Sequence, residues 1–226
     1  MFLETLRISS EYLRFCLFFN NESFIFLDFD GVIKDSVEIK SIAFEQLFQP
    51  FGNDIAKKVR LHHEANGGMS RFEKLPIYLS WSGLSSDLKM IKQYSSKFSN
   101  LVVQRVIESE WVEGVENFLE KYHKKQNFFL VTATPQQEIQ EITNALNISR
   151  YFRSIIGSPT KKVDAIRSLL NDYHINTDQS VMIGDSMSDY QGASANNVPF
   201  ILRKTRLNQD LQRELDCPMI ENFNYE

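Results

Sequence analysis

Residues 24–36 read FIFLDFDGVIKDS. Four apolar residues with high strand propensity, Phe24–Leu27, are followed at once by Asp28 and Asp30. Alternate residues of an extended chain point to the same side, so the two carboxylates would share one face. Carboxylates that close repel each other, and burying either is costly unless a cation or hydrogen bonds compensate. The stretch is therefore either an acidic loop or the end of a strand at which a positive charge binds.

Four further apolar runs have the length of buried strands: 128–131, 154–156, 181–183 and 200–202. Helix-length amphipathic segments lie between the later ones, at 135–146, 161–173 and 188–195. Strands that alternate with helices of this length are typical of right-handed βαβ crossovers. The pattern predicts an α/β fold, a Rossmann-like parallel sheet with helices on both faces.

The alternation is interrupted once, between the first strand and the run at 128–131. Helical patterns occupy this interval at 38–48, 54–64, 71–79 and 87–109. A long helical insert between two parallel strands predicts a separate helical subdomain over residues 37–108. Residues 24–36 and 109–226 would then form the α/β core, and residues 1–23 an N-terminal extension.

Composition limits the classes of function. The chain has 226 residues, 42% of them hydrophobic, which is typical of a globular protein. A net charge of −4 argues against binding nucleic acid through bulk charge. Cys16 and Cys217 have no metal-ligand spacing, which favours free thiols in a reducing cytoplasm. Charged residues interrupt the apolar N-terminal run, so we expect no membrane span or signal sequence. Monomer and homodimer both remain open.

Polar residues follow the predicted strands at the edge where their carboxyl ends would meet. They are Asp28, Asp30, Thr132, Thr134, Asp185 and Asp189, joined by Lys161 and Lys162 at the start of a helix. Carboxylates are the hard oxygen ligands that Mg²⁺ prefers, together with water and substrate phosphate. A carboxylate can also attack phosphorus, and a second one can transfer protons.

Four motifs in this order resemble the haloacid dehalogenase-type hydrolase superfamily, specifically its phosphatase branch. They are DFDGV at 28–32, VTAT at 131–134, a lysine at 161–162 and GDSMSD at 184–189. The resemblance implies that Asp28 is the nucleophile and also contacts Mg²⁺. It implies that Asp30 is the general acid and base, with its backbone carbonyl on the metal. A leaving alkoxide needs a proton and a leaving halide does not, so Asp30 favours phosphoryl transfer over carbon–halogen cleavage.

The remaining site roles also follow from the resemblance. Thr132 would bind the transferring phosphoryl group, and Lys162 would neutralise it, with Lys161 as the alternative. Asp185 would hold Mg²⁺, and Asp189 would bind the metal or its waters, or orient the lysine. Gly31 lets the chain turn away sharply, and we expect it beside the substrate.

The helical insert resembles a type 1 cap, a lid that closes over the site and excludes water. Within it, the segment NGGMSR at 66–71 resembles the cap loop of β-phosphoglucomutases and of sugar-phosphate phosphatases. In that reading Arg71 binds an anionic group of the substrate through its guanidinium. The alternative is a turn between helices with a surface arginine.

We therefore expect an Mg²⁺-dependent phosphatase of a small phosphorylated metabolite, such as a sugar phosphate or a phosphoglycolate-like ester. A phosphosugar mutase is the alternative, although Lys40 stands where mutases carry a histidine. A non-catalytic binding module on the same fold is a third hypothesis. Lys40 would be either a solvated helix residue or an anion contact.

Three residue types near the motifs have structural interpretations. Thr134 before Pro135 is typical of a helix N-cap followed by proline at the first helical position, with a second phosphate ligand as the alternative. Ser186 is expected to cap the next helix or bond within its loop, with a catalytic role as the alternative. His62 and His63 are adjacent, so on a helix they would face different directions and pack rather than share a metal.

Overall fold

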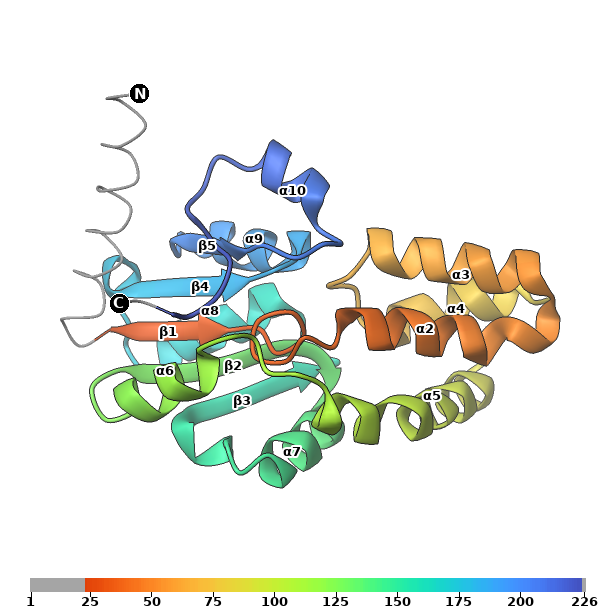
Figure 1. Ribbon diagram of the computed structural model, residues 1–226, viewed down its shortest axis with the longest axis horizontal. Coiled ribbons are helices and arrows are strands. Elements are labelled where there is room, and N and C mark those ends of the chain that lie inside the picture. The colour runs from red at the N-terminus through yellow and green to blue at the C-terminus, as the bar shows by residue number, and fades with distance from the viewer. Residues whose placement is uncertain (1–22, 225–226) are drawn as a thin grey trace.

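The computed structural model describes residues 23–224 (Figure 1). The expected N-terminal extension lies outside this range except for Ser23, and so does Cys16. Cys217 is a free thiol, as predicted. Within the described range, no helix combines the length and the apolar character needed to cross a membrane.

A six-stranded parallel sheet forms the centre of the molecule, which confirms the predicted α/β class. Its order is β3-β2-β1-β4-β5-β6. The strands are β1 (Phe24–Leu27), β2 (Asn127–Pro135), β3 (Phe152–Ser158), β4 (Ser180–Gly184), β5 (Phe200–Arg203) and β6 (Met219–Ile220). Each predicted strand lies within one of the first five. The sixth strand was not predicted, because two residues are too few to carry a periodic pattern.

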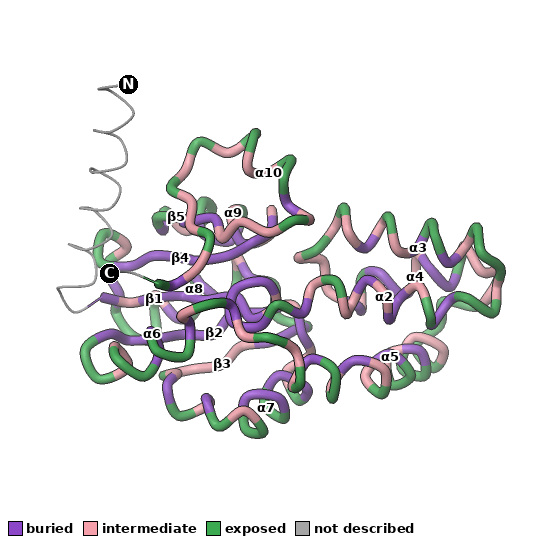
Figure 2. The backbone as a smooth tube through the Cα atoms, viewed as in Figure 1, coloured by how far each residue is buried: buried purple, intermediate pink, exposed green. Residues whose placement is uncertain are grey.

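Helices cover both faces of this sheet, and the alternation of side chains along β1 explains why. Ile25 and Leu27 face the core that includes α6 (Val115–Tyr122) and α7 (Gln136–Ala145). Phe26 faces the opposite core, with α8 (Lys162–Asp172) and α9 (Met187–Ser194). Both faces of β1 are thus apolar, as expected for a central strand of a parallel sheet. Strands β1, β2 and β4 run through the buried interior, whereas much of β3 is half-buried (Figure 2).

The helical insert lies beyond the carboxyl ends of the strands (Figure 1). Its helices are α2 (Val37–Phe48), α3 (Asn53–Ala65), α4 (Arg71–Trp81) and α5 (Leu88–Glu108), each within a few residues of its predicted range. Aromatic rings fill its centre: Phe44 and Phe98 stack with centroids 3.9 Å apart, and Tyr78 meets Phe44 edge-on at 5.4 Å. These rings belong to the same apolar cluster as Ile25 and Leu27, so the insert packs continuously onto one face of the sheet.

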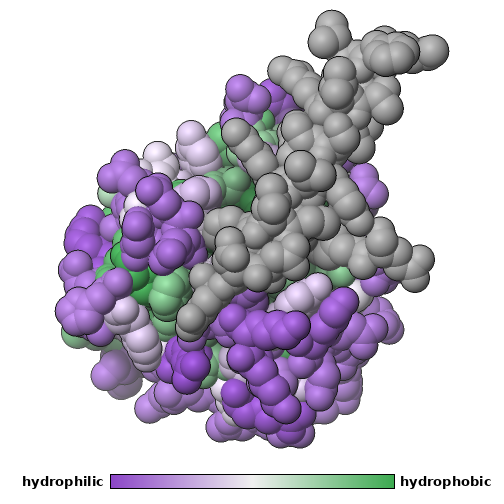
Figure 3. Space-filling view, turned by 90° about the vertical axis from the view of Figure 1, so that its left-hand side faces the viewer, coloured by the Kyte–Doolittle hydropathy of each residue, from purple (hydrophilic) through white to green (hydrophobic). Residues whose placement is uncertain are grey.

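Short elements complete the fold. Helix α10 (Gln209–Glu214) precedes β6, and 3-10 turns occur at Gln49–Phe51, Ser149–Tyr151 and Thr177–Gln179. Figure 3 looks at the end of the molecule that carries the amino ends of the strands. Much of the coloured surface there is hydrophilic, with a smaller hydrophobic area beside it. The polar residues that the sequence singled out lie at the opposite end.

Candidate active site

The strand order creates a crevice at the carboxyl end of β1. The chain passes from β1 to β2 and β3 on one side, and then crosses to β4 on the other. In open α/β sheets, ligands bind at such a reversal. Leu27 pairs with Ile183, so β1 and β4 end almost level. Asp28 and Asp185, each the first residue after its strand, therefore emerge at the same crevice.

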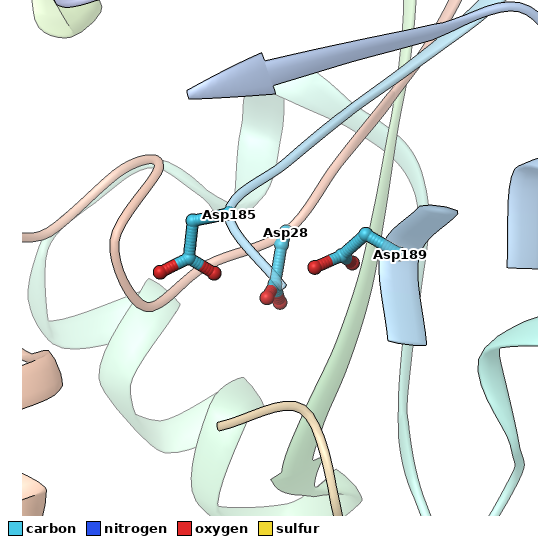
Figure 4. A group of neighbouring side chains, drawn as sticks. All are labelled: Asp28, Asp185 and Asp189. Atoms are coloured by element: carbon cyan, nitrogen blue, oxygen red, sulfur yellow. The ribbon is translucent and has the colours of Figure 1, made fainter. Parts of the chain in front are cut away.

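Three buried carboxylates meet there (Figure 4). Asp28, Asp185 and Asp189 offer oxygens that all lie within 4.8 Å of one another, with Asp28 in the middle. Burial, with Asp189 and Asp30 adding to it, raises the pKa of Asp28 to about 7 even though Lys162 opposes the shift. Burial and the neighbouring carboxylates also raise the pKa of Asp185 well above its usual range. Both shifts show that the negative charges of these carboxylates repel one another in a buried site.

One lysine reaches this group. Lys162, the first residue of α8, places Nζ 2.7 Å from Asp28 Oδ2 and 2.5 Å from Asp189 Oδ1. Burial opposes its charge, but Asp189 and Asp28 outweigh burial and raise the pKa of Lys162. Lys161 is exposed. Of the two candidate lysines, the structure therefore brings Lys162 to the carboxylates.

The donor set suits a hard divalent cation. Three buried carboxylates face one ammonium group, so their formal charge exceeds that of the lysine. A divalent ion among the carboxylate oxygens would relieve this repulsion, and oxygen ligands of this kind are those that Mg²⁺ takes. The carboxylate of Asp30 lies outside the group.

Asp30 is turned toward a different set of partners. Its Oδ1 accepts a hydrogen bond from Ser36 Oγ at 2.6 Å, and its Oδ2 accepts from Lys40 Nζ at 2.5 Å and from Thr134 Oγ1 at 3.1 Å. Burial favours the neutral acid, but Lys40 and these hydrogen bonds outweigh it and lower the pKa of Asp30. Asp28 and Asp30 thus occupy distinct electrostatic environments.

Two structural interpretations of single residues were wrong. Lys40 is not a solvated helix residue, because its side chain is 12% exposed and pairs with Asp30; an anion contact for Lys40 stays a prediction. Thr134 is not an N-cap: it belongs to β2, Pro135 occupies the cap position, and Thr134 Oγ1 bonds to Asp30 instead. The alternation along VTAT could have revealed this, since it sets Thr134 beside Thr132. Ser186 caps α9 through Asp189, as expected.

Gly31 leaves room for the carboxylate of Asp185, because it has no side chain. Its φ is +76°, and a Cβ atom there would lie 2.1 Å from Asp185 Oδ2. Only glycine therefore combines this left-handed turn with the position of Asp185. Gly31 was expected beside the substrate, but it is absent from the residues that line the cavity described next.

A cavity of about 60 Å³ lies between the strand ends and the helical insert. Asp28, Asp30, Thr132, Ala133, Thr134 and Asp185 line it from the sheet. Phe44 and Phe98 contribute apolar wall from the insert. The loop after α3 packs closely on the start of α9, since a Cβ atom on Gly68 would lie 1.9 Å from Ser188 Oγ. The insert therefore contacts the core beside the cavity.

Arg71 also lines the cavity, but its guanidinium is occupied by the protein. Nη2 and Nη1 lie 2.6 and 2.8 Å from the two oxygens of Glu138 on α7, and Nη1 donates to Ser99 Oγ at 2.7 Å. The arginine is 5% exposed, so the surface-arginine alternative was wrong. Sequence reasoning missed Glu138, because the carboxylate lies 67 residues away and no motif marks it.

Breaking the pair of Arg71 and Glu138 should destabilise the fold. Arg71→Met leaves a buried carboxylate without its cation, and Glu138→Gln leaves a buried guanidinium underpaired, so each should lower the free energy of unfolding by about 3 kcal/mol. The double variant should lose less than the sum, as measured by denaturant unfolding. Arg167→Met, which removes an exposed pair with Asp164, is the control and should change stability by about 0.5 kcal/mol or less. Unchanged stability in Arg71→Met would contradict the structural role.

Comparison with known proteins agrees with this geometry. A family model described as haloacid dehalogenase-like hydrolase matches residues 25–202. Phosphoglycolate phosphatase from Pseudomonas savastanoi is 25% identical over 191 residues, covering 77% of this chain and 66% of the relative. A 5'-nucleotidase from Pseudomonas aeruginosa is 25% identical over 185 residues, covering 78% and 80%. The chain thus spans about two thirds of the length of the first of these relatives.

A solved structure shows the same fold. CbbY from Rhodobacter sphaeroides, determined in complex with phosphate, superposes with a TM-score of 0.71 at 14% identity, covering 89% of this chain and 95% of CbbY. The named curated relatives are phosphatases. Because the family model spans well over half of the sequence, the protein belongs to the haloacid dehalogenase-like hydrolase family, with its similarities on the phosphatase branch.

Proposed function

We propose that this protein is an Mg²⁺-dependent phosphatase that hydrolyses a small phosphorylated metabolite through an aspartyl-phosphate on Asp28. One observation carries the proposal. A carboxylate bonded to a buried lysine and a second carboxylate with separate hydrogen-bond partners line the same cavity. Such a pair, with different electrostatic surroundings, suits one nucleophile and one proton donor.

The first half-reaction forms the phosphoryl enzyme. An oxygen of Asp28 attacks phosphorus, the bond from phosphorus to the ester oxygen breaks, and Asp30 gives its proton to the leaving alkoxide. Lys162 and Thr132 would hold the phosphoryl oxygens as charge spreads over them. In the second half-reaction Asp30 takes a proton from water, whose oxygen attacks phosphorus and releases Asp28 and inorganic phosphate.

Asp28, Asp185 and Asp189 would hold Mg²⁺, with the backbone carbonyl of Asp30 as a further ligand. When bound, the ion supplies positive charge that screens the carboxylates and the phosphoryl oxygens. Lys162 is shared between Asp28 and Asp189, so it also fixes the orientation of the nucleophile. Residues 37–108 would act as a type 1 cap over a core of 24–36 and 109–226, excluding water during transfer.

A panel of phosphorylated metabolites tests the proposal. Purified protein with Mg²⁺ should release inorganic phosphate from at least one member, including phosphoglycolate, a sugar phosphate and a nucleoside 5'-monophosphate. Formation of an isomeric sugar phosphate without free phosphate would favour the mutase instead. Release from none of them would favour a non-catalytic binding module.

Removal of divalent metal should abolish phosphate release, and added Mg²⁺ should restore it. Independently of activity, Mg²⁺ should raise the thermal unfolding midpoint, because a ligand of the folded state stabilises it. Asp185→Asn should lose this shift, while Asp178→Asn, at an exposed position before β4, should keep it. An equal shift in Asp185→Asn and in the unsubstituted protein would contradict the assigned ligands.

A further inference from the structure

The insert side of the cavity is basic. Four residues contribute to it: Lys40, His63, Arg71 and Lys74. They face the phosphoryl-transfer carboxylates across the same small volume. A substrate enclosed there would carry its phosphate toward Asp28 and its other end toward these groups. Which of them is available to bind that other end depends on their existing partners.

Two of the basic groups are already neutralised. Lys40 Nζ lies 2.5 Å from Asp30, and Arg71 is paired with Glu138 at 2.6 Å. Burial, with the charges of Lys74 and Lys40 adding to it, lowers the pKa of His63 well below its usual range. His63 is therefore a neutral imidazole at physiological pH. Lys40, Arg71 and His63 therefore provide little uncompensated positive charge for binding an anion.

Lys74 differs from the others. Among residues 23–224, no carboxylate oxygen lies within 4 Å of its Nζ, and its hydrogen-bond partner is His63 Nδ1 at 2.9 Å. The side chain is 1% exposed, so water does not compensate its charge. Burial, reinforced by Lys40, lowers the pKa of Lys74 to about 7. A buried ammonium without a counter-ion is costly, and an anion in the cavity would stabilise it.

The position of Lys74 on α4 strengthens the assignment. It lies three residues after Arg71, so the two side chains project from the same face of the helix toward the cavity. The guanidinium of Arg71 forms an ion pair with Glu138 on α7, whereas Lys74 forms no such pair in the described structure. If Lys74 served only for packing, methionine would fill the same space without the free-energy cost of a buried charge.

We propose that Lys74, oriented by His63, binds a second anionic group of the substrate, so that the substrate is a compact phosphate monoester carrying a carboxylate or a second phosphate. This proposal rests on the proposed phosphatase function. Asp28 and Lys74 line one cavity of about 60 Å³, so a substrate that reaches both needs only a few atoms between its two anionic groups.

Matched substrates test the proposal in the unsubstituted protein. Phosphoglycolate carries a carboxylate, 2-hydroxyethyl phosphate replaces it with an uncharged alcohol, and ethane-1,2-diol bisphosphate carries a second phosphate. We expect kcat/KM to be at least tenfold higher for one of the two doubly anionic esters than for the alcohol. The preferred one identifies the second group. Hydrolysis of all three without that preference would overturn the role of Lys74 and leave the phosphatase function standing. Hydrolysis of none of the three, with phosphate released from another member of the metabolite panel, would overturn the compact doubly anionic substrate alone, whereas release from no ester of either set would remove the phosphatase function as well.

Substitution tests the residue itself. Lys74→Met should reduce the preference for the doubly anionic ester at least tenfold, mainly by raising its KM. A purely structural role would lower kcat/KM equally for all esters and leave the ratio unchanged, which would overturn the assignment. Lys57→Met, at an exposed lysine of α3, is the matched control and should keep the preference. If Lys74→Met does not fold, the substrate comparison in the unsubstituted protein still decides.

Discussion

Replacing Asp28 by asparagine should lower the rate of phosphate release by about 10⁴-fold or more, because a carboxamide cannot replace the nucleophilic carboxylate. The structure adds a second reason. Asp28 Oδ1 accepts from the backbone N–H of Phe29 at 2.7 Å, and Oδ2 accepts from Lys162 at 2.7 Å. An asparagine that kept the first bond would turn its NH₂ group toward the lysine, so donor would face donor. Phosphate release with saturating Mg²⁺ measures the effect.

The matched control is Asp35→Asn, which changes an exposed carboxylate in the same loop and should keep full activity. Acid quenching during turnover should trap a phosphoryl group on the peptide that contains Asp28 in the unsubstituted protein. Mass spectrometry should find no such adduct in Asp28→Asn. Wild-type turnover in Asp28→Asn would exclude the covalent mechanism.

The sequence predicted the sheet and the carboxylate group because both depend on local patterns. Apolar runs marked the first five strands, and the parallel topology then required Asp28 and Asp185 to meet at one edge. The choice between Lys161 and Lys162 needed the structure, since both begin the same helix. The structure shows that Lys162 points toward the carboxylates, whereas Lys161 is exposed to solvent.

The insert side of the cavity could not be predicted in the same way. Whether a basic residue is free to bind substrate depends on where its counter-ion lies in space. Arg71 has Glu138 as its partner, brought in by α7, while among residues 23–224 no carboxylate lies within 4 Å of Lys74 Nζ. Sequence reasoning assigned the anion contact on α4 to Arg71, which stays a prediction, and we propose such a contact for Lys74, one turn later.

Replacing Asp30 by asparagine should slow the hydrolysis of alkyl phosphates by about 10²–10⁴-fold, the usual contribution of general acid–base catalysis. The loss should be smaller for p-nitrophenyl phosphate in the phosphoryl-transfer step, because its leaving group departs without a proton. Rapid-mixing measurement of the first turnover with the two kinds of ester provides this comparison. Equal losses for both would argue that Asp30 only positions its neighbours.

The surroundings of Asp30 make this comparison informative. Lys40 and Thr134 both bond to Asp30 Oδ2 and favour the carboxylate, which is the form that accepts a proton from water. Donation to a leaving alkoxide requires the neutral acid, and therefore a weaker contact with Lys40. Lys40→Met should reduce the difference in phosphoryl-transfer rate between the p-nitrophenyl ester and the alkyl ester, because protonation of Asp30 then costs less free energy. A wider gap between them in Lys40→Met would contradict the control of Asp30 by Lys40.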